Sequence, residues 1–257
     1  LGEYLKMMFL LEPLFFFSSL KKIGKFGPEL EFLYCQMGYT DMVISIASYR
    51  ESLPYHCIPD FSAPPRMMSA AGLCHPLIED CVPNDIHTGD KGMLITGSNM
   101  SGKTTFIRTV AVNAVLAQTI HTCYAQSYSA ALYLISSSIS ISDELTEGKS
   151  YYQAEVESIH RLLKDSESGK SCLLILDEVF KGTNTVERVA AGYALLSYLD
   201  KPNSLTLVST HDIELNEMLH KQYHLYHFQE EVAENELFFD HKLHEGPLKT
   251  RNALKIL

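Results

Sequence analysis

The sequence has no pair of cysteines at the Cys-x-x-Cys spacing, although six cysteines are scattered along its 257 residues. A disulfide framework and a zinc ribbon are therefore not indicated, and reduced thiols in a cytoplasmic protein are the simpler interpretation. The histidines also lack zinc-binding spacings such as H-E-x-x-H. We expect no structural zinc.

Basic residues are scarce. Lys and Arg number 21 against 31 Asp and Glu, which gives a formal net charge of -10. A typical nucleic-acid-binding domain has a pI above about 9. Any contact with DNA is therefore expected through a local patch, or through regions outside this chain.

No uninterrupted apolar run reaches the roughly 18 residues that a membrane-spanning helix needs. The most apolar stretch, residues 4–17, contains Lys6, Glu12 and Pro13, so we interpret it as a buried or interfacial helix. A basic leader with a small-residue cleavage site is missing too. Because the chain begins at Leu1 rather than at methionine, we expect it to be a piece of a longer protein.

The remaining composition is that of a globular protein, with 46% hydrophobic and 20% charged residues. Up to about Tyr55 the pattern is helical, with loop signals at Gly24, Gly27 and Pro28. Six prolines between residues 54 and 84 then favour extended, turning chain. We therefore expect a helical subdomain over residues 1–58 and a second domain over residues 59–257.

From residue 91 onward, short apolar runs alternate with helical patterns, which indicates parallel strands joined by helices. The expected fold class is α/β, with a mainly parallel sheet flanked by helices. The expected strands are 93–96, 132–141, 172–176 and 205–209, with helices at 103–118, 152–163 and after 185, and a hairpin over 223–243. In the second of these helices the apolar face is expected to consist of Tyr152, Val156, Ile159 and Leu163.

The strongest motif runs from Gly97 to Thr104 and reads G-S-N-M-S-G-K-T, which satisfies G-x-x-x-x-G-K-[ST]. It lies between a predicted strand and a predicted helix, as the motif requires. Glycines let consecutive N–H groups turn toward one anion, and the helix start adds partial positive charge. We expect Lys103 to reach the β and γ phosphates of a nucleotide and Thr104 to bind Mg²⁺.

A second motif, residues 172–178, is an apolar strand that ends in two acids. Asp177 at its tip is suited to hold magnesium. Glu178 is placed to orient and deprotonate an attacking water. The two acids together predict hydrolysis of the nucleotide rather than binding alone.

Two further segments place polar side chains at the end of a predicted strand and at the start of a predicted helix. His211 follows a predicted strand, where a histidine either donates to the γ-phosphate or is, more commonly, an ordinary loop residue. Ser150 and Gln153 form an S-x-x-Q capping box at a helix start. A helix start that carries Gly148, Lys149 and Ser150 is also an anion site, whose anion need not come from the same subunit.

Together these motifs resemble the C-terminal ATPase domain of the MutS family of DNA mismatch repair proteins, a branch of the ABC-type P-loop ATPases. The resemblance covers the chain from about residue 60 onward. It rests on His75-Pro76-Leu77, Val82-Pro83-Asn84-Asp85, Thr96 to Thr105 with its internal Asn-Met, Glu147 to Glu155, Leu176 to Asn184, and Ser209-Thr210-His211-Asp212.

The resemblance implies ATP and Mg²⁺ as cofactors and a role for each matched position. Glu178 would activate water, His211 would sense the γ-phosphate, and Ser150 would reach the nucleotide bound by the partner in a homodimer. Asp177 and Thr104 would bind Mg²⁺. The nucleotide would contact Val82 and Asn84 near the adenine and, around its phosphates, Gly97, Ser98, Asn99, Met100, Ser101, Gly102, Lys103, Thr104 and Thr105. ATP-driven dimer closure would be coupled to DNA held by regions outside this chain.

Departures from the family pattern predict a divergent branch. Cys81 stands where an aromatic residue often precedes the Val-Pro-Asn-Asp stretch, and Val-Phe-Lys-Gly-Thr-Asn follows the two acids. We identify no mismatch-reading domain, which would carry a Phe-x-Glu wedge, in these residues. Two alternatives remain open: a nucleotide-gated binding switch with negligible turnover, and another ABC-type DNA-maintenance ATPase. Against the latter stands the absence of an L-S-G-G-Q signature.

Overall fold

The computed structural model describes residues 11–139, 151–180, 184–233 and 236–248. Contacts divide the chain into one part that ends at Ser52 and a second that begins at Leu53. The sequence places this division at residue 58. Each part is described by itself.

The described residues of the first part form the α-helix α2 (Leu11–Ser52), which continues through Gly24, Gly27 and Pro28. The loop expected at these three residues is therefore wrong. An interior glycine costs about 1 kcal/mol and a proline about 3 kcal/mol relative to alanine, and the helix-forming residues on both sides outweigh these costs. Within the described residues, no helix is both long and apolar enough to span a membrane.

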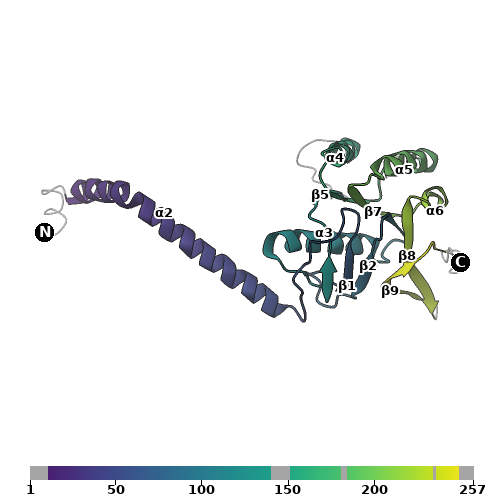
Figure 1. The fold of residues 1–257 in the computed structure, drawn as a ribbon, viewed down its shortest axis with the longest axis horizontal. Coiled ribbons are helices and arrows are strands. Elements are labelled where there is room, and N and C mark those ends of the chain that lie inside the picture. The colour runs from purple at the N-terminus through teal and green to yellow at the C-terminus, as the bar shows by residue number, and fades with distance from the viewer. Residues whose placement is uncertain (1–10, 140–150, 181–183, 234–235, 249–257) are drawn as a thin grey trace. The chain divides into compact units, whose positions relative to one another are not determined.

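The second part, whose strands and helices Figure 1 draws from β1 to β9, contains a six-stranded sheet in the order β5-β6-β7-β3-β8-β9. Strands β5, β6, β7, β3 and β8 run parallel to one another, and β9 pairs antiparallel with β8. The mixed α/β class with a mostly parallel sheet is therefore confirmed. The strands are β3 (Gly92–Thr96), β5 (Leu134–Ser138), β6 (Cys172–Asp177), β7 (Ser204–Thr210), β8 (Tyr223–Ala233) and β9 (Glu236–Glu245).

Helices cover both faces of this sheet, which explains the continuous apolar runs of its central strands. Along β6, Leu173 and Ile175 pack on the face that carries α3, whereas Leu174 and Leu176 pack on the opposite face. This alternation follows from the two-residue period of a strand. The helices are α3 (Lys103–Ile120) on the first face and α4 (Tyr151–Ser166), α5 (Thr185–Leu199) and α6 (Glu214–Leu219) on the second.

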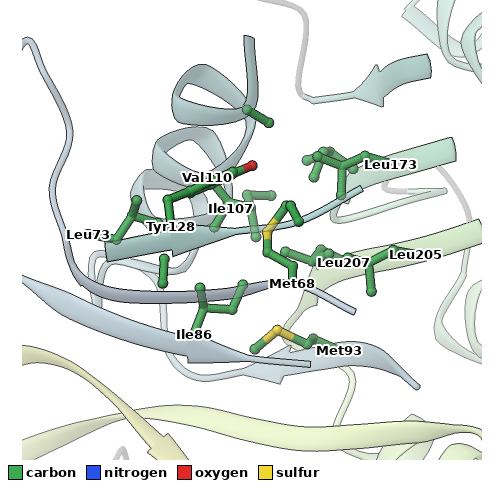
Figure 2. Close-up of a cluster of buried hydrophobic side chains, with 14 of the residues drawn as sticks. Met68, Leu73, Ile86, Met93, Ile107, Val110, Tyr128, Leu173, Leu205 and Leu207 are labelled. Carbon is green, nitrogen blue, oxygen red and sulfur yellow. The ribbon is translucent and has the colours of Figure 1, made fainter. Parts of the chain in front are cut away.

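A three-stranded antiparallel sheet, in the order β2-β1-β4, completes the first face. Its strands are β1 (Ser69–Leu73), β2 (Asn84–His87) and β4 (Ser127–Ser129). The proline spacing predicts extended chain here but not this sheet, because β4 comes from a segment after α3. Figure 2 shows side chains from both sheets and α3 meeting in one core, which includes Ile86, Ile107 and Leu207.

The apolar face expected for α4 is partly wrong. Ile159 is buried as expected, but Val156 is 42% exposed, whereas Leu162 is fully buried. The helix is rotated so that Glu155 and Ser158 also face inward. A buried carboxylate on this face requires a hydrogen-bond partner, and that partner lies at the candidate site.

Candidate functional site

The candidate site lies where strands β3, β6 and β7 end at the same edge of the sheet. Residues 97–102 form the loop between β3 and α3, and we call them the glycine-rich loop. The backbone is left-handed at Met100 (φ 71°) and at Gly102 (φ 112°). A side chain at Gly97 would come within 2.8 Å of the Phe228 carbonyl oxygen, so this position requires glycine.

Lys103 begins helix α3 and turns back into the glycine-rich loop. Its Nζ donates hydrogen bonds to the carbonyl oxygens of Gly97 (2.9 Å) and Ser98 (2.8 Å), and the residue is only 4% exposed. The N-cap, Gly102, has no side chain to cap the helix. An anion at this position would take over that capping role and meet the positive end of the helix dipole.

Thr104 and Asp177, the two expected magnesium ligands, are in contact. Thr104 Oγ1 donates to Asp177 Oδ2 (3.0 Å) and Oδ1 (3.2 Å). Ser209, at the end of β7, also donates to Asp177 Oδ1. Carboxylate and hydroxyl oxygens are the ligands that Mg²⁺ prefers, and Mg²⁺ usually keeps several waters besides. This donor set fits magnesium, and sequence reasoning did not assign the Ser209 contact.

Glu178 follows Asp177 with a left-handed backbone (φ 48°), which is uncommon for a residue other than glycine. Its N–H donates to the Ser209 carbonyl oxygen at 2.9 Å, which ties it to β7. The carboxylate oxygen Oε1 lies 4.0 Å from Lys103 Nζ and 3.8 Å from His211 Nδ1. Strained backbone of this kind clusters at functional sites, where the surrounding structure maintains it.

Glu155 in α4 holds the segment after Glu178, and sequence reasoning gave it no role. Its Oε1 accepts a hydrogen bond from the N–H of Phe180, which is itself left-handed (φ 61°). The residue is 8% exposed, and Oε2 has no hydrogen-bond partner among the described residues. Placing Glu155 requires knowing which face of α4 is buried, and the apolar pattern misjudged that face.

His211 follows β7, and the fold brings it next to Glu178. Its side chain is 44% exposed, and Nε2 lies 3.9 Å from Asp212 Oδ1. Asp212 in turn pairs with Arg188 of α5. Neither of the last two residues was identified from the sequence as part of the site.

A cavity of about 290 Å³ adjoins the glycine-rich loop. Val82 and Asn84, expected near a base, both line it, together with Cys81. Phe228 and His241 of the β8–β9 hairpin contribute further walls, and only the tertiary structure brings them here. A partly apolar cavity with a few convergent polar groups is suited to a small ligand such as a nucleotide base.

The hairpin is tied to the loop by hydrogen bonds. His241 Nδ1 lies 3.1 Å from the Ser101 carbonyl oxygen, and only a protonated Nδ1 satisfies this acceptor. Asn84 Nδ2 donates to the carbonyl oxygens of Val82 (3.1 Å) and His241 (3.0 Å), and its Oδ1 accepts from Leu243 N (2.8 Å). The Asn84 amide thus joins two walls of the cavity.

The remaining expected residues are Asn99, Thr105 and Ser150. Asn99 lies in the glycine-rich loop, and Thr105 in the first turn of α3 borders the cavity. Ser150 lies outside the described residues.

Comparisons with known proteins bear on the same region. The family model described as MutS domain V matches residues 93–256. The DNA mismatch repair protein MutS of Lactobacillus gasseri is 30% identical over 241 residues, which are 88% of this chain and 28% of that protein. The MutS protein of Lactobacillus delbrueckii subsp. bulgaricus is 32% identical over 244 residues, or 90% of this chain and 28% of that protein.

The DNA mismatch repair protein MutS of Thermus thermophilus is 35% identical over 177 residues, which cover 67% of this chain and 22% of that protein. The chain therefore spans less than a third of the length of these relatives. The matched family model covers more than half of the chain, including the glycine-rich loop, both acids and His211. On this match, the chain belongs to the MutS family.

Proposed function

We propose that this chain is a Mg²⁺-dependent ATPase domain of the ABC type, which binds ATP at the glycine-rich loop and hydrolyses it. The observation that carries the proposal is the meeting of Lys103, Asp177 and Glu178 at one edge of the sheet. Lys103 Nζ lies 4.0 Å from Glu178 Oε1. This proximity supports roles for the three residues in binding phosphate, binding magnesium and activating water.

The triphosphate would occupy the glycine-rich loop, from Gly97 to Gly102, and the first turn of α3. Lys103 would exchange its contacts with loop carbonyl oxygens for contacts with the β and γ phosphates. The base would enter the neighbouring cavity between Val82 and His241. Such positioning is most of what phosphoryl transfer requires from a protein.

Magnesium bound at Thr104 and Asp177 would supply neutralisation of the phosphate charge. Glu178 would accept a proton from the attacking water, and its neighbours keep the carboxylate aimed into the site. His211 would donate a hydrogen bond to the γ-phosphate and thereby distinguish ATP from ADP.

The wider function rests on the family. We propose that two copies of this chain close on ATP, with Ser150 of one copy reaching the nucleotide of the other. This closure would be passed to DNA held by regions outside the chain, in mismatch repair. The net charge of -10 is consistent with DNA contact lying elsewhere.

The test is phosphate release by the purified protein with ATP and Mg²⁺, compared with the E178Q variant. Loss of general base catalysis should lower turnover by about a hundredfold or more, while binding of ATP is retained. Equal turnover in the two proteins would contradict the assigned base. Turnover far slower than nucleotide-dependent partner release in single-turnover experiments would instead favour the binding switch.

A further inference from the structure

Arg188, in the first turn of α5, makes a two-point ion pair with Asp212, the residue after His211. Arg188 Nε donates to Asp212 Oδ2 (2.8 Å), and Nη2 donates to Oδ1 (2.6 Å). Two parallel N–H···O bonds fix the relative orientation of both groups, which a single contact does not. The pair therefore joins α5 rigidly to the segment that carries His211.

Both partners are largely withdrawn from water, with side chains 14% and 6% exposed. Burial alone would raise the pKa of Asp212, but the hydrogen bonds and charge of Arg188 outweigh it, with His211 and Thr210 adding to the effect, and hold this pKa below its usual value. A buried ion pair often contributes less to stability than an apolar pair of the same shape. We therefore consider the orientation that the pair imposes on its neighbours, and not its contribution to stability.

The residue whose orientation matters here is His211, because the contacts of its own side chain do not fix its position. The imidazole is 44% exposed, and its nitrogens lie 3.8 Å from Glu178 Oε1 and 3.9 Å from Asp212 Oδ1, both beyond hydrogen-bond length. Its position therefore depends on the backbone on either side. Asp212 N donates to Thr210 Oγ1 at 3.0 Å, which makes a tight turn around His211, and Arg188 anchors that turn.

Arg188 directs one edge of its guanidinium at Asp212. That carboxylate uses the Nε and Nη2 donors, so a contact of these two donors with a phosphate would require breaking the pair. The charge of Glu178 does act on it, since Asp212 first and then Glu214 and Glu178 raise the pKa of Arg188. The guanidinium thus lies at the border of the site and acts through its neighbour.

We propose that Arg188 is a positioning residue for His211: its two-point pair with Asp212 fixes the turn that aims the imidazole at the terminal phosphate beside Glu178. This inference rests on the proposed function. It adds a residue to the site from α5, an element to which the motifs assign none of the chemistry.

The experiment compares R188A, R188K and H211A with a matched control, R66A. Arg66 also makes a 2.6 Å ion pair, with Asp200, and both side chains are 19% exposed, but neither residue belongs to the site. We expect R188A to lower kcat about ten- to a hundredfold, with KM changed less than about threefold, because a small misplacement of a reacting group has effects of this size. R188K should lie between wild type and R188A, since lysine makes only one of the two contacts.

The double variant R188A/H211A separates positioning from a structural role. If Arg188 acts through His211, the double variant should be no slower than H211A alone. Losses of kcat that multiply, or an R188A loss no larger than that of R66A, would overturn the inference. Melting temperatures of all variants identify any that fail to fold, and R188K serves where R188A does so.

A second readout does not depend on turnover. His211 should favour a nucleotide with a γ-phosphate, so the ratio of affinities for a non-hydrolysable ATP analogue and for ADP should fall equally in R188A and H211A. An unchanged ratio in R188A beside a lowered ratio in H211A would overturn the inference. Absent turnover in wild type would contradict the proposed function, and the affinity ratio would still decide the role of Arg188.

Discussion

Thr104 and Asp177, which are 73 residues apart in the sequence, are joined by hydrogen bonds of 3.0 and 3.2 Å. Thr104 lies in the first turn of the helix after the glycine-rich loop, and Asp177 ends strand β6. Their contact prearranges two oxygen ligands of the kind that magnesium prefers. The first prediction follows from this pair.

Replacing Asp177 with asparagine should abolish the strengthening of ATP binding by Mg²⁺, because the carboxylate charge is lost while the amide oxygen can still accept from Thr104. The measurement is a fluorescence titration of ATP with Mg²⁺ and with EDTA. S209A removes only the hydrogen bond that Ser209 donates to Asp177. This variant should weaken magnesium binding by about tenfold. Equal Mg²⁺ dependence in D177N and wild type would refute the assignment.

Lys103→Ala should weaken ATP binding by about 2 kcal/mol, or roughly thirtyfold, since hydrogen bonds to charged groups are worth about 1.5–3 kcal/mol. Its ammonium lies inside the glycine-rich loop and contacts two carbonyl oxygens there. Isothermal titration calorimetry measures the affinity. K170A, at an exposed lysine, is the control and should bind ATP like wild type.

Glu155→Ala should lower turnover about tenfold while leaving ATP affinity nearly unchanged, because the Phe180 N–H loses its acceptor and the strained segment that carries Glu178 is released. E155Q keeps an acceptor oxygen and should retain most of the activity. E157A changes an exposed glutamate of the same helix and provides the control. Steady-state kinetics decide the matter, and an E155Q loss as large as that of E155A would argue against the hydrogen bond as the cause.

The lowered pKa of Asp212 predicts that the stability of the protein depends on pH in the acid range. Its pKa in the folded protein is below the ordinary value of 3.8, so its ionisation stabilises the fold above that pH. This contribution is lost as the pH falls through the lower folded value. At pH 7 the free energy of unfolding of wild type should exceed that of D212N by roughly 1.5–3 kcal/mol. The two free energies should converge in acid. Urea unfolding across the pH range tests this, and a constant difference would contradict it.

Gly92 lies in β3 between two neighbouring strands, where a methyl group would come within 2.6 Å of both the Thr206 carbonyl oxygen and the Tyr223 ring. Gly92→Ala should therefore destabilise the protein by about 1–3 kcal/mol through overpacking. G192A is the matched control, because a methyl group there meets Leu215 at an ordinary 3.5 Å. Urea unfolding that ranks the two variants equally would show that the strands move apart without cost.

The sequence predicts the parallel sheet well because each central strand is covered on both faces and therefore reads as an unbroken apolar run. The same argument fails for the three-stranded sheet. Its strands are short, and in the sequence two of them precede α3 and one follows it. It fails again at Gly24 to Pro28, where local break signals cost less than the long helix gains. Local propensity is a weak guide wherever distant residues or long elements dominate.

The same division holds within the candidate site. Residues of the glycine-rich loop and the two acids are recognisable because their chemistry demands fixed residue types at fixed local spacing. Glu155, Arg188 and His241 have no such spacing. Each acts through one hydrogen bond or ion pair made across elements, to Phe180, Asp212 or Ser101.

By itself, then, the sequence determined the strands and helices of the parallel sheet and the residues that we propose to bind phosphate, magnesium and water, because short-range geometry dictates these. Only the tertiary structure decided which face of α4 is buried, which hairpin closes the cavity and which arginine anchors the turn around His211. Those outcomes depend on packing between segments far apart in the chain, where burial selects one partner for each polar group.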